Sequence, residues 1–270
     1  MEKITVGIIG CGTLGSELAK FLFKKFSKQM SLRFVCDRDP QKILRIKKSF
    51  DFKIQSVSFD ALIRKSDLII ETASADAAAR VAQRALLLNK KALILSVGGL
   101  LKIPNLFSKI RASKGRLWIP SGAIAGVDGL AAAKEGRISR VRLVTRKPPR
   151  GLNQAPYFKR HAFPKISGKK ASRIFKGTAR QAVRDFPQNI NVAAVLSLAG
   201  IGAAKTEVEI WTSHQYHSNC HEVLIEGNFG TIRAVTDNKP SPQNPKTSYL
   251  AALSAMAVLR EIFSSIEVGT

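Results

Sequence analysis

The sequence predicts an α/β protein whose first 120 residues form a parallel sheet, followed by a strand-rich segment and a closing helix. Short apolar runs alternate with segments of helical periodicity from Ile4 to about Gly99, which is typical of strand–helix–strand units. A turn with three glycines joins the first apolar run to the first helical segment. Beyond about Pro120, apolar and polar residues alternate with the period of a strand.

The elements of the first part follow from local signals. Asp39 is suited to cap a helix and Pro40 to occupy its first position, while Ser74 is suited to cap a long Ala-rich helix. Strands are expected at 4–9, 32–37, 68–71 and 92–97, and helices at 16–26, from 40 onward and from 74 to 88.

The second part is expected to contain strands at 140–149, within 205–214 and within 221–237, where the run EGNFG predicts a hairpin turn. A long basic loop is expected from Asn153 to Arg180. The apolar segment from Lys246 to Phe263 predicts a helix that packs back on the first domain. These elements divide the chain into residues 1–120, 121–245 and 246–270.

Charge is the abnormal feature of the composition. The formal net charge is +25, and residues 136–184 hold 15 Lys and Arg but no Asp or Glu. Such a run can attract nucleic acid, but it carries no RNA-binding motif, so a solvated insertion is the preferred interpretation. Scattered cysteines, no leader-like start and no apolar run of about 18 residues favour a cytoplasmic protein without a membrane segment.

The glycine turn has the spacing G-x-G-x-x-G and the context of a dinucleotide site. Gly10 permits the tight turn, Gly12 lets the backbone approach a pyrophosphate, and Gly15 allows close packing of helix on strand. With Thr13 and Leu14 between the last two glycines, the helix N-terminus faces the phosphates. The sequence therefore predicts a Rossmann-type domain that binds a dinucleotide.

An acidic residue at the end of the second strand agrees with this prediction. Asp37 lies about 20 residues beyond the glycines, where a carboxylate would hold the ribose hydroxyls and favour NAD. Arg38 follows it and could accept the 2′-phosphate of NADP. The small residues Ala73 and Ser74 follow the third strand, where a nicotinamide ring could lie against the backbone.

The second half resembles the L-aspartate dehydrogenases of NAD biosynthesis. The segments that carry this resemblance are SGAIAGVDGLAAAKEG, TRKPPRGL, FPQNINVAAVLSLAGIG, NCHEVLIEGNFG and NPKTSYLAALSA. The resemblance implies a Rossmann domain with an α/β catalytic domain that has a mixed sheet. It also implies a homodimer and NAD(P)-dependent oxidation of L-aspartate to iminoaspartate, which yields oxaloacetate and ammonia or feeds quinolinate synthesis.

The resemblance also implies roles for individual residues. The catalytic histidine of the N-x-H-x-[IV] motif corresponds to His221, and nicotinamide contacts correspond to Ala125 and Asn191. A histidine near its usual pKa of about 6.5 suits proton transfer. The candidates for binding the substrate are Asn219, Lys246, Thr247 and Ser248, and Lys147, Arg150 and Arg233 are further possible cations.

Two functional alternatives stay open. The chain could act on another amino acid or dicarboxylate, or it could be a dinucleotide sensor that binds nucleic acid without catalysis. His214, His217, Cys220 and His221 have spacings that resemble zinc ligation, but strand alternation places Cys220 on the other face, so no metal is expected. The basic loop at 153–180 could be a lid that attracts anions or an idle insertion.

Overall fold

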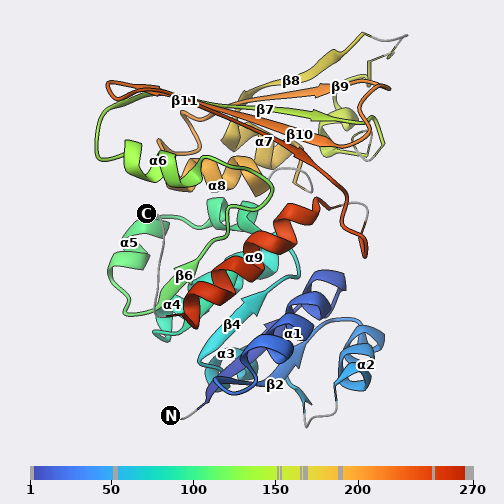
Figure 1. Cartoon of the computed structure of the whole chain (residues 1–270), viewed down its shortest axis with the longest axis vertical. Coiled ribbons are helices and arrows are strands. Elements are labelled where there is room, and N and C mark those ends of the chain that lie inside the picture. Colours follow the sequence, from blue (N-terminus) through green and yellow to red (C-terminus); the bar gives the residue numbers. More distant parts are fainter. Residues whose placement is uncertain are drawn as a thin grey trace. The chain divides into compact units, whose positions relative to one another are not determined.

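The computed structural model describes residues 3–50, 54–150, 152, 154–164, 166, 170–187, 191–244 and 247–264. Within these ranges the chain forms two compact units (Figure 1). One consists of residues up to 120 together with 255–264, and the other of residues 121–254.

The first unit contains a parallel sheet of six strands in the order β3-β2-β1-β4-β5-β6. The neighbouring strands of this sheet are all parallel, which confirms the predicted strand–helix–strand architecture. The strands are β1 Ile4–Ile9, β2 Met30–Cys36, β3 Gln55–Ser56, β4 Leu68–Glu71, β5 Lys91–Ile94 and β6 Arg116–Trp118.

Local capping explains where two helices of this unit begin. The Asp39 carboxylate accepts from the N–H of Gln41 at 2.9 Å, and the Ser74 hydroxyl accepts from the N–H of Ala77 at 3.3 Å, so both predicted caps are confirmed. The helices are α1 Thr13–Phe26, α2 Pro40–Ser49, α3 Phe59–Lys65, α4 Ala75–Leu87, the 3₁₀ helix η1 Val97–Lys102 and α5 Leu106–Arg111.

One predicted strand is too long. The segment 92–97 was expected to be extended, but β5 ends at Ile94 and a 3₁₀ helix begins at Val97. The N–H of Ser96 turns toward the buried Glu71 carboxylate, and the N–H of Gly99 donates to the Ser96 carbonyl. The chain therefore leaves the sheet earlier than the apolar pattern indicates.

The closing helix α9 Tyr249–Ile262 completes the core of the first unit. Its residues Ala255 and Leu259 are fully buried there beside Leu18 and Leu22 of α1. The ring of Phe263 stacks on that of Phe26 with centroids 4.8 Å apart. The predicted return of the last helix to the first domain is confirmed.

The second unit contains a mixed sheet in the order β11-β10-β7-β9-β8, with only β7 and β9 parallel. Its strands are β7 Ile138–Lys147, β8 Ser172–Thr178, β9 Glu207–Thr212, β10 Asn219–Gly227 and β11 Gly230–Asn238. The expected hairpin turn lies between β10 and β11. One face is covered by α6 Val127–Ala133, α7 Ala179–Asp185 and α8 Asn191–Ala199 (Figure 1).

The expected basic loop at 153–180 is only partly a loop. Residues 172–178 form the edge strand β8, and residues 156–159 form the 3₁₀ helix η2 Pro156–Lys159. Ile174 and Phe175 are buried, and Phe175 packs edge-on against Phe186 with ring centroids 5.4 Å apart. Two adjacent apolar residues, Ile174 and Phe175, therefore anchor a strand that the surrounding charges obscured in the sequence.

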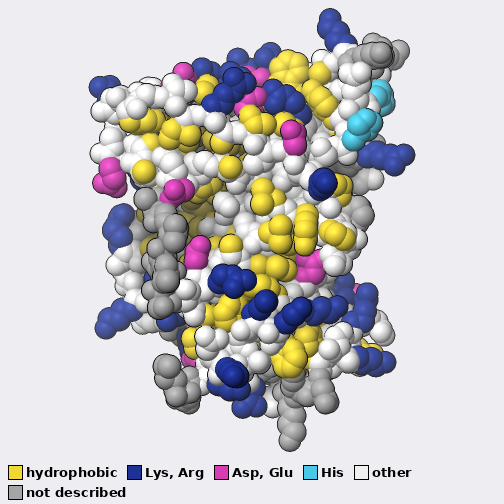
Figure 2. Space-filling view, in the orientation of Figure 1, with side chains coloured by type: hydrophobic (Ala, Val, Ile, Leu, Met, Phe, Trp, Pro, Cys, Tyr) yellow, Lys and Arg dark blue, Asp and Glu magenta, His cyan; other side chains and the backbone are white. Residues whose placement is uncertain are grey.

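On the outer face of this sheet, some residues of the basic run pair with acids. Arg146 and Arg233 both contact Glu222, at 2.9 and 2.8 Å, and Arg140 contacts Glu207 at 2.8 Å. Figure 2 shows this mixing of Lys and Arg with Asp and Glu over the sheet. The acids come from β9 and β10, outside the sequence run, so the excess charge of that run is partly neutralised in the fold.

Candidate active site

The three glycines of the first turn differ in why a larger side chain would or would not fit at each position. Gly10 has φ +100°, and a Cβ there would lie 2.7 Å from the backbone nitrogen of Ala73. A Cβ on Gly15 would collide with the Gly10 carbonyl oxygen. A Cβ on Gly12 would meet no atom within 4 Å. The fold itself requires Gly10 and Gly15, whereas the space above Gly12 fits a phosphate group.

The N-terminus of α1 suits an anion. The helix has no side-chain cap and no acidic residue in its first turn, and its first intrahelical bond runs from the N–H of Ser16 to the carbonyl of Gly12 at 2.9 Å. The preceding N–H groups of Thr13, Leu14 and Gly15 belong to the helix end that intrahelical bonds leave unsatisfied. With the helix dipole they suit a pyrophosphate.

Asp37 is tied to the glycine turn. Its carboxylate accepts from the N–H of Cys11 at 2.7 Å and from the N–H of Asp39 at 2.9 Å. Each carboxylate oxygen keeps a lone pair that can accept from a ribose hydroxyl. Burial, helped by Asp37, raises the pKa of the Cys11 thiol to about 12. Arg38 is exposed beside the site.

Glu71 joins the ends of two neighbouring strands. This fully buried carboxylate accepts from the N–H groups of Ala73, Ser74 and Ser96 and from the Ser96 hydroxyl, at 2.7 to 3.1 Å. Burial raises the pKa of Glu71, while these four donors oppose the shift. The Thr72 hydroxyl donates to the Gly10 carbonyl at 2.6 Å, so this loop and the glycine turn meet.

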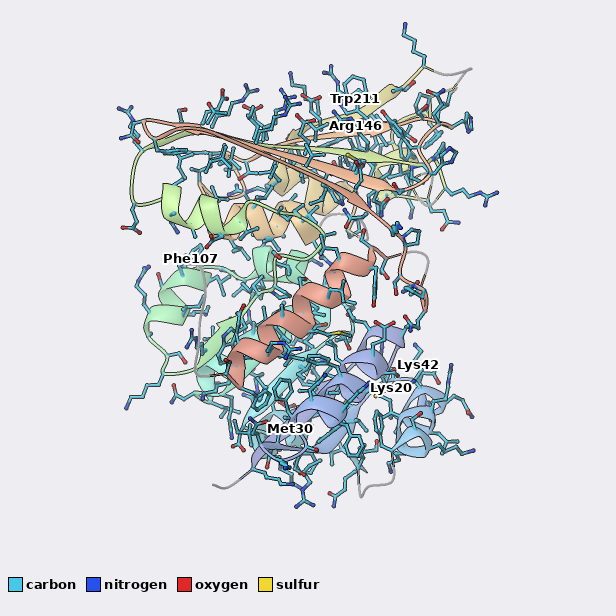
Figure 3. The ribbon with its side chains drawn as sticks, viewed as in Figure 1. Lys20, Met30, Lys42, Phe107, Arg146 and Trp211 are labelled. Carbon is cyan, nitrogen blue, oxygen red and sulfur yellow. The ribbon has the colours of Figure 1, made fainter. Side chains whose placement is uncertain are left out.

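In the second unit, the helix-covered face of the sheet changes from apolar to polar along the strands. Val223 of β10 lies opposite Leu143 of β7, while two residues away His221 lies opposite Thr145. Two residues beyond Thr145 on β7, Lys147 lies opposite Thr212 of β9. The intervening residues Arg146 and Trp211 belong to the outer face (Figure 3).

His221 lies within this polar end and is 3% exposed. Its Nδ1 is 3.0 Å from the Thr145 hydroxyl. Burial, followed by the charge of Lys147, lowers the pKa of His221 to about 3, and burial lowers the pKa of Lys147 to about 8. The expectation of a histidine near its usual pKa is therefore wrong for the protein alone, because the imidazole is desolvated beside a cation.

This burial predicts a pH dependence of stability. The His221 pKa is about 3 folded and 6.5 unfolded, so the neutral ring stabilises the fold above pH 6.5 and that contribution is lost as the pH falls toward 3. Between pH 6.5 and 5 we expect wild type to lose roughly 1.5–2 kcal/mol more than His221→Gln. Urea unfolding at both pH values measures this difference, and parallel losses in the two proteins would contradict it.

The segment 121–126 is held to β11. The Ala123 carbonyl accepts from the Thr236 hydroxyl at 2.9 Å and from the Asn238 amide at 3.0 Å. Ala125 is exposed next to this anchor, and Gly126, with φ +85°, is the N-cap residue that precedes α6. The backbone around Ala125 is thus fixed while its side chain stays accessible.

The remaining predicted residues are placed as follows. The Asn219 amide lies 3.5 Å from the hydroxyl of the buried Ser248, so these two are brought together on the side of the sheet that carries His221. Thr247 is exposed and its hydroxyl donates to the Asn244 carbonyl. Asn191 is the exposed first residue of α8. Lys246 lies outside the described residues.

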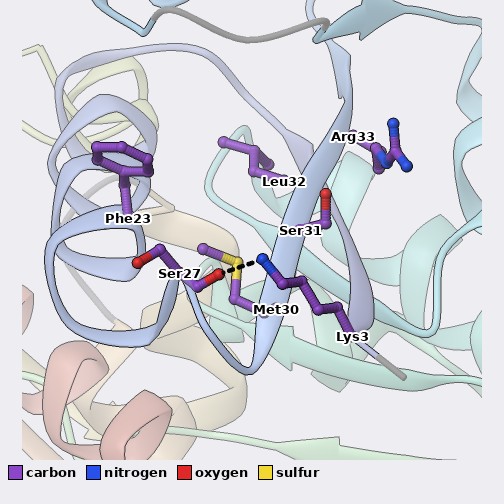
Figure 4. Close-up of a pocket in the computed structure, with 7 residues that line it drawn as sticks. All are labelled: Lys3, Phe23, Ser27, Met30, Ser31, Leu32 and Arg33. Carbon is purple, nitrogen blue, oxygen red and sulfur yellow. Dashed lines mark hydrogen bonds between the residues drawn. The ribbon is translucent and has the colours of Figure 1, made fainter. Parts of the chain in front are cut away.

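The zinc-like spacing of His214, His217, Cys220 and His221 and a pocket away from the glycine turn remain to be considered. Among the described residues, no group of three His, Cys, Asp or Glu side chains could hold a metal ion. A pocket lined by residues from Lys3 to Arg33 lies at the amino ends of β1 and β2 (Figure 4). It is therefore remote from the glycine turn, which follows the carboxyl end of β1. Its Lys3 ammonium donates to the Ser27 carbonyl at 2.8 Å.

Comparison with known proteins decides the family. Residues 128–262 match the family model "Aspartate dehydrogenase, C-terminal". The chain is 40% identical to the L-aspartate dehydrogenase of Methanosarcina acetivorans over 271 residues, covering 99% of this chain and all of that protein. The chain belongs to the L-aspartate dehydrogenase family.

Other members of the family agree. L-Aspartate dehydrogenase 3 of Bordetella bronchiseptica is 36% identical, with 100% of this chain and 98% of that protein covered. The crystal structure of aspartate dehydrogenase from Thermotoga maritima superposes with a TM-score of 0.75 at 25% identity, covering 99% of this chain and 100% of that one. Residues 10–120 match "Homoserine dehydrogenase, NAD binding domain". No helix among the described residues is long and apolar enough to cross a membrane.

Proposed function

We propose that the chain catalyses the NAD(P)-dependent oxidation of L-aspartate to iminoaspartate, which water then converts to oxaloacetate and ammonia. The full-length match to L-aspartate dehydrogenases carries this proposal. The open space at Gly12 and the uncapped α1 support dinucleotide binding, and the buried imidazole supports proton transfer. Residues 1–120 would serve as the cofactor domain and 121–245 as the catalytic domain.

The cofactor, when bound, accepts a hydride from the α-carbon of L-aspartate. The residues of the chain would hold it at three of its groups, the pyrophosphate, the ribose and the nicotinamide. The glycine turn and the first turn of α1 donate to the pyrophosphate, and Asp37 accepts from the ribose hydroxyls. Ala73, Ser74, Ala125 and Asn191 would contact the nicotinamide, with the Asn191 amide able to pair with the carboxamide.

His221 would act on the substrate as a base. Its neutral imidazole can accept a proton from the substrate ammonium or from the water that adds to the imine, while the Thr145 hydroxyl orients the ring. A bound dicarboxylate would offset the charge of Lys147 and raise the His221 pKa toward neutrality. Asn219, Lys246, Thr247 and Ser248 would bind the substrate carboxylates.

The proposed preference for NAD over NADP rests on Asp37. We expect Asp37→Ala to raise KM for NAD about tenfold, because a charge-assisted hydrogen bond and a brace of the glycine turn are both lost. Discrimination against NADP should relax, since the carboxylate no longer repels the 2′-phosphate and Arg38 remains.

The matched control is Asp39→Ala. It removes a neighbouring carboxylate that caps α2, so it should cost about 1 kcal/mol of stability and leave the cofactor ratio unchanged. KM and kcat for NAD and NADP are measured with both variants. An unchanged NADP/NAD ratio of kcat/KM in Asp37→Ala would remove Asp37 from ribose recognition.

The activity itself is tested by absorbance of the reduced nicotinamide. L-Aspartate with NAD or NADP should give signal, and oxaloacetate with ammonia should consume the reduced cofactor. A panel of other amino acids and dicarboxylates runs beside them. Turnover of another member of the panel at higher kcat/KM than L-aspartate would replace the substrate and leave the dehydrogenase class intact.

We infer that the protein assembles as a homodimer and supplies iminoaspartate for NAD biosynthesis. Both inferences rest on the family resemblance. Light scattering of the purified chain tests the first, with twice the monomer mass of 29.5 kDa expected. Incorporation of L-aspartate carbon into quinolinate in a coupled reaction with quinolinate synthase tests the second.

A further inference from the structure

Thr212 is a buried polar residue that the fold does not use. It is the last residue of β9, its side chain is fully buried, and its hydroxyl has no hydrogen-bond partner. Leaving a buried hydroxyl unsatisfied destabilises a fold, and native proteins contain few such groups. A hydroxyl retained at this cost points to a ligand that satisfies it.

The neighbour of Thr212 across the sheet is a cation. Thr212 pairs in register with Lys147 of β7, so the two side chains start from strands about 4.8 Å apart and share the helix-covered face. The cation on the preceding residue, Arg146, belongs to the opposite face with Trp211 (Figure 3). It pairs there with Glu222.

Lys147 also faces the candidate base. Its charge lowers the pKa of His221, which lies on β10, the strand on the other side of β7. The order across the face is therefore Thr212, Lys147, His221. Two donors, a hydroxyl and an ammonium, stand on the side away from the imidazole.

We propose that Thr212 and Lys147 form the subsite for the side-chain carboxylate of L-aspartate, with Thr212 as a specificity-determining residue. The inference rests on the proposed function. A carboxylate offers lone pairs to both donors at once. The reacting carbon belongs next to His221, so the carboxylate farther from that carbon falls to Thr212.

Thr212→Val tests the proposal because valine keeps the shape and removes only the hydroxyl. We expect an unchanged or higher unfolding midpoint, since no partner inside the fold is lost. KM for L-aspartate should rise about tenfold with kcat within about threefold, and KM for NAD should not change.

Thr206→Val is the matched control. Thr206 is equally buried, but its hydroxyl donates to the Gly202 carbonyl at 3.0 Å. This variant should unfold more easily and keep its KM for L-aspartate. Thr212→Ser, which keeps the hydroxyl, should retain a KM near that of wild type, whereas Thr212→Ala should not. The Ser and Ala pair decides the matter if the valine variant does not fold.

Succinate, a dicarboxylate that lacks the amino group, separates this inference from the proposed function. Succinate should stabilise the wild type against thermal unfolding, and its Kd for Thr212→Val should be at least about fivefold higher than for wild type. Propionate should stabilise neither protein. If wild type fails to oxidise L-aspartate but shows this succinate difference, the proposed function falls and the dicarboxylate subsite stands. If wild type is active and Thr212→Val binds L-aspartate and succinate normally, the hydroxyl holds only an ordered water and the inference is overturned.

Discussion

Replacing His221 by alanine should reduce kcat for L-aspartate oxidation about 10²- to 10⁴-fold while leaving NAD affinity nearly intact. The imidazole is the one neutral base that we assign to the reaction, and loss of a positioned base has effects of this size. Affinity for NAD should persist because the glycine turn and Asp37 belong to the first unit. Steady-state absorbance assays of the reduced nicotinamide give kcat, and fluorescence titration gives the Kd for NAD.

Two further variants separate catalysis from packing. His221→Ala leaves a cavity in a buried face, so its unfolding midpoint must be measured beside that of His221→Gln, which fills the space without supplying a base. Thr145→Val removes the partner of Nδ1 and should lower kcat by a smaller factor, since the ring keeps its basicity but loses an orienting contact. Turnover near the wild-type rate in both His221 variants would exclude His221 from the mechanism.

Gly15→Ala should lose stability, whereas Gly12→Ala should fold normally and lose affinity for NAD. A methyl group on Gly15 collides with the Gly10 carbonyl oxygen, so this variant should lose about 3 kcal/mol of stability. A methyl group on Gly12 meets no protein atom and the backbone there has φ −71°, so folding should be unaffected. That methyl group would occupy the proposed pyrophosphate site, so KM for NAD should rise by more than about tenfold.

Thermal unfolding and cofactor titration of the two glycine variants are measured together. The decisive observation is the combination in Gly12→Ala of a wild-type unfolding midpoint with weak NAD binding. Wild-type affinity for NAD in that variant would show that the open space above Gly12 is not the phosphate site.

Local chemistry made part of this structure predictable. Helix caps such as Asp39 and Ser74 act within three residues, so the sequence alone contains their reason. The turn from Gly10 to Gly15 is equally local, because its spacing, strand and helix all lie within one segment. The mixed sheet of the second domain followed from family resemblance rather than from periodicity.

Long-range contacts set what the sequence could not predict. The donors to Glu71 include Ser96, 25 residues away, so no window around Glu71 indicated its role. The low pKa of His221 comes from burial and from Lys147 on another strand. Thr212 looked like an ordinary strand residue, and only the register with Lys147 and the missing partner set it apart. Strand β8 was not predicted because only two of its seven residues are buried and they lie between Arg173 and Lys176.

The four hydrogen bonds that the Glu71 carboxylate accepts limit how the enzyme can be re-engineered. Since one carboxylate fixes the backbone after both β4 and β5, those two segments behave as a single rigid piece. Random libraries that include position 71 would mostly return unfolded or cofactor-free clones. Substitutions at Asp37 and Arg38 would change the coenzyme preference, and substitutions at Ala73 would change the shape of the proposed nicotinamide site. Both alter side chains and leave that rigid piece intact, so directed evolution should begin there.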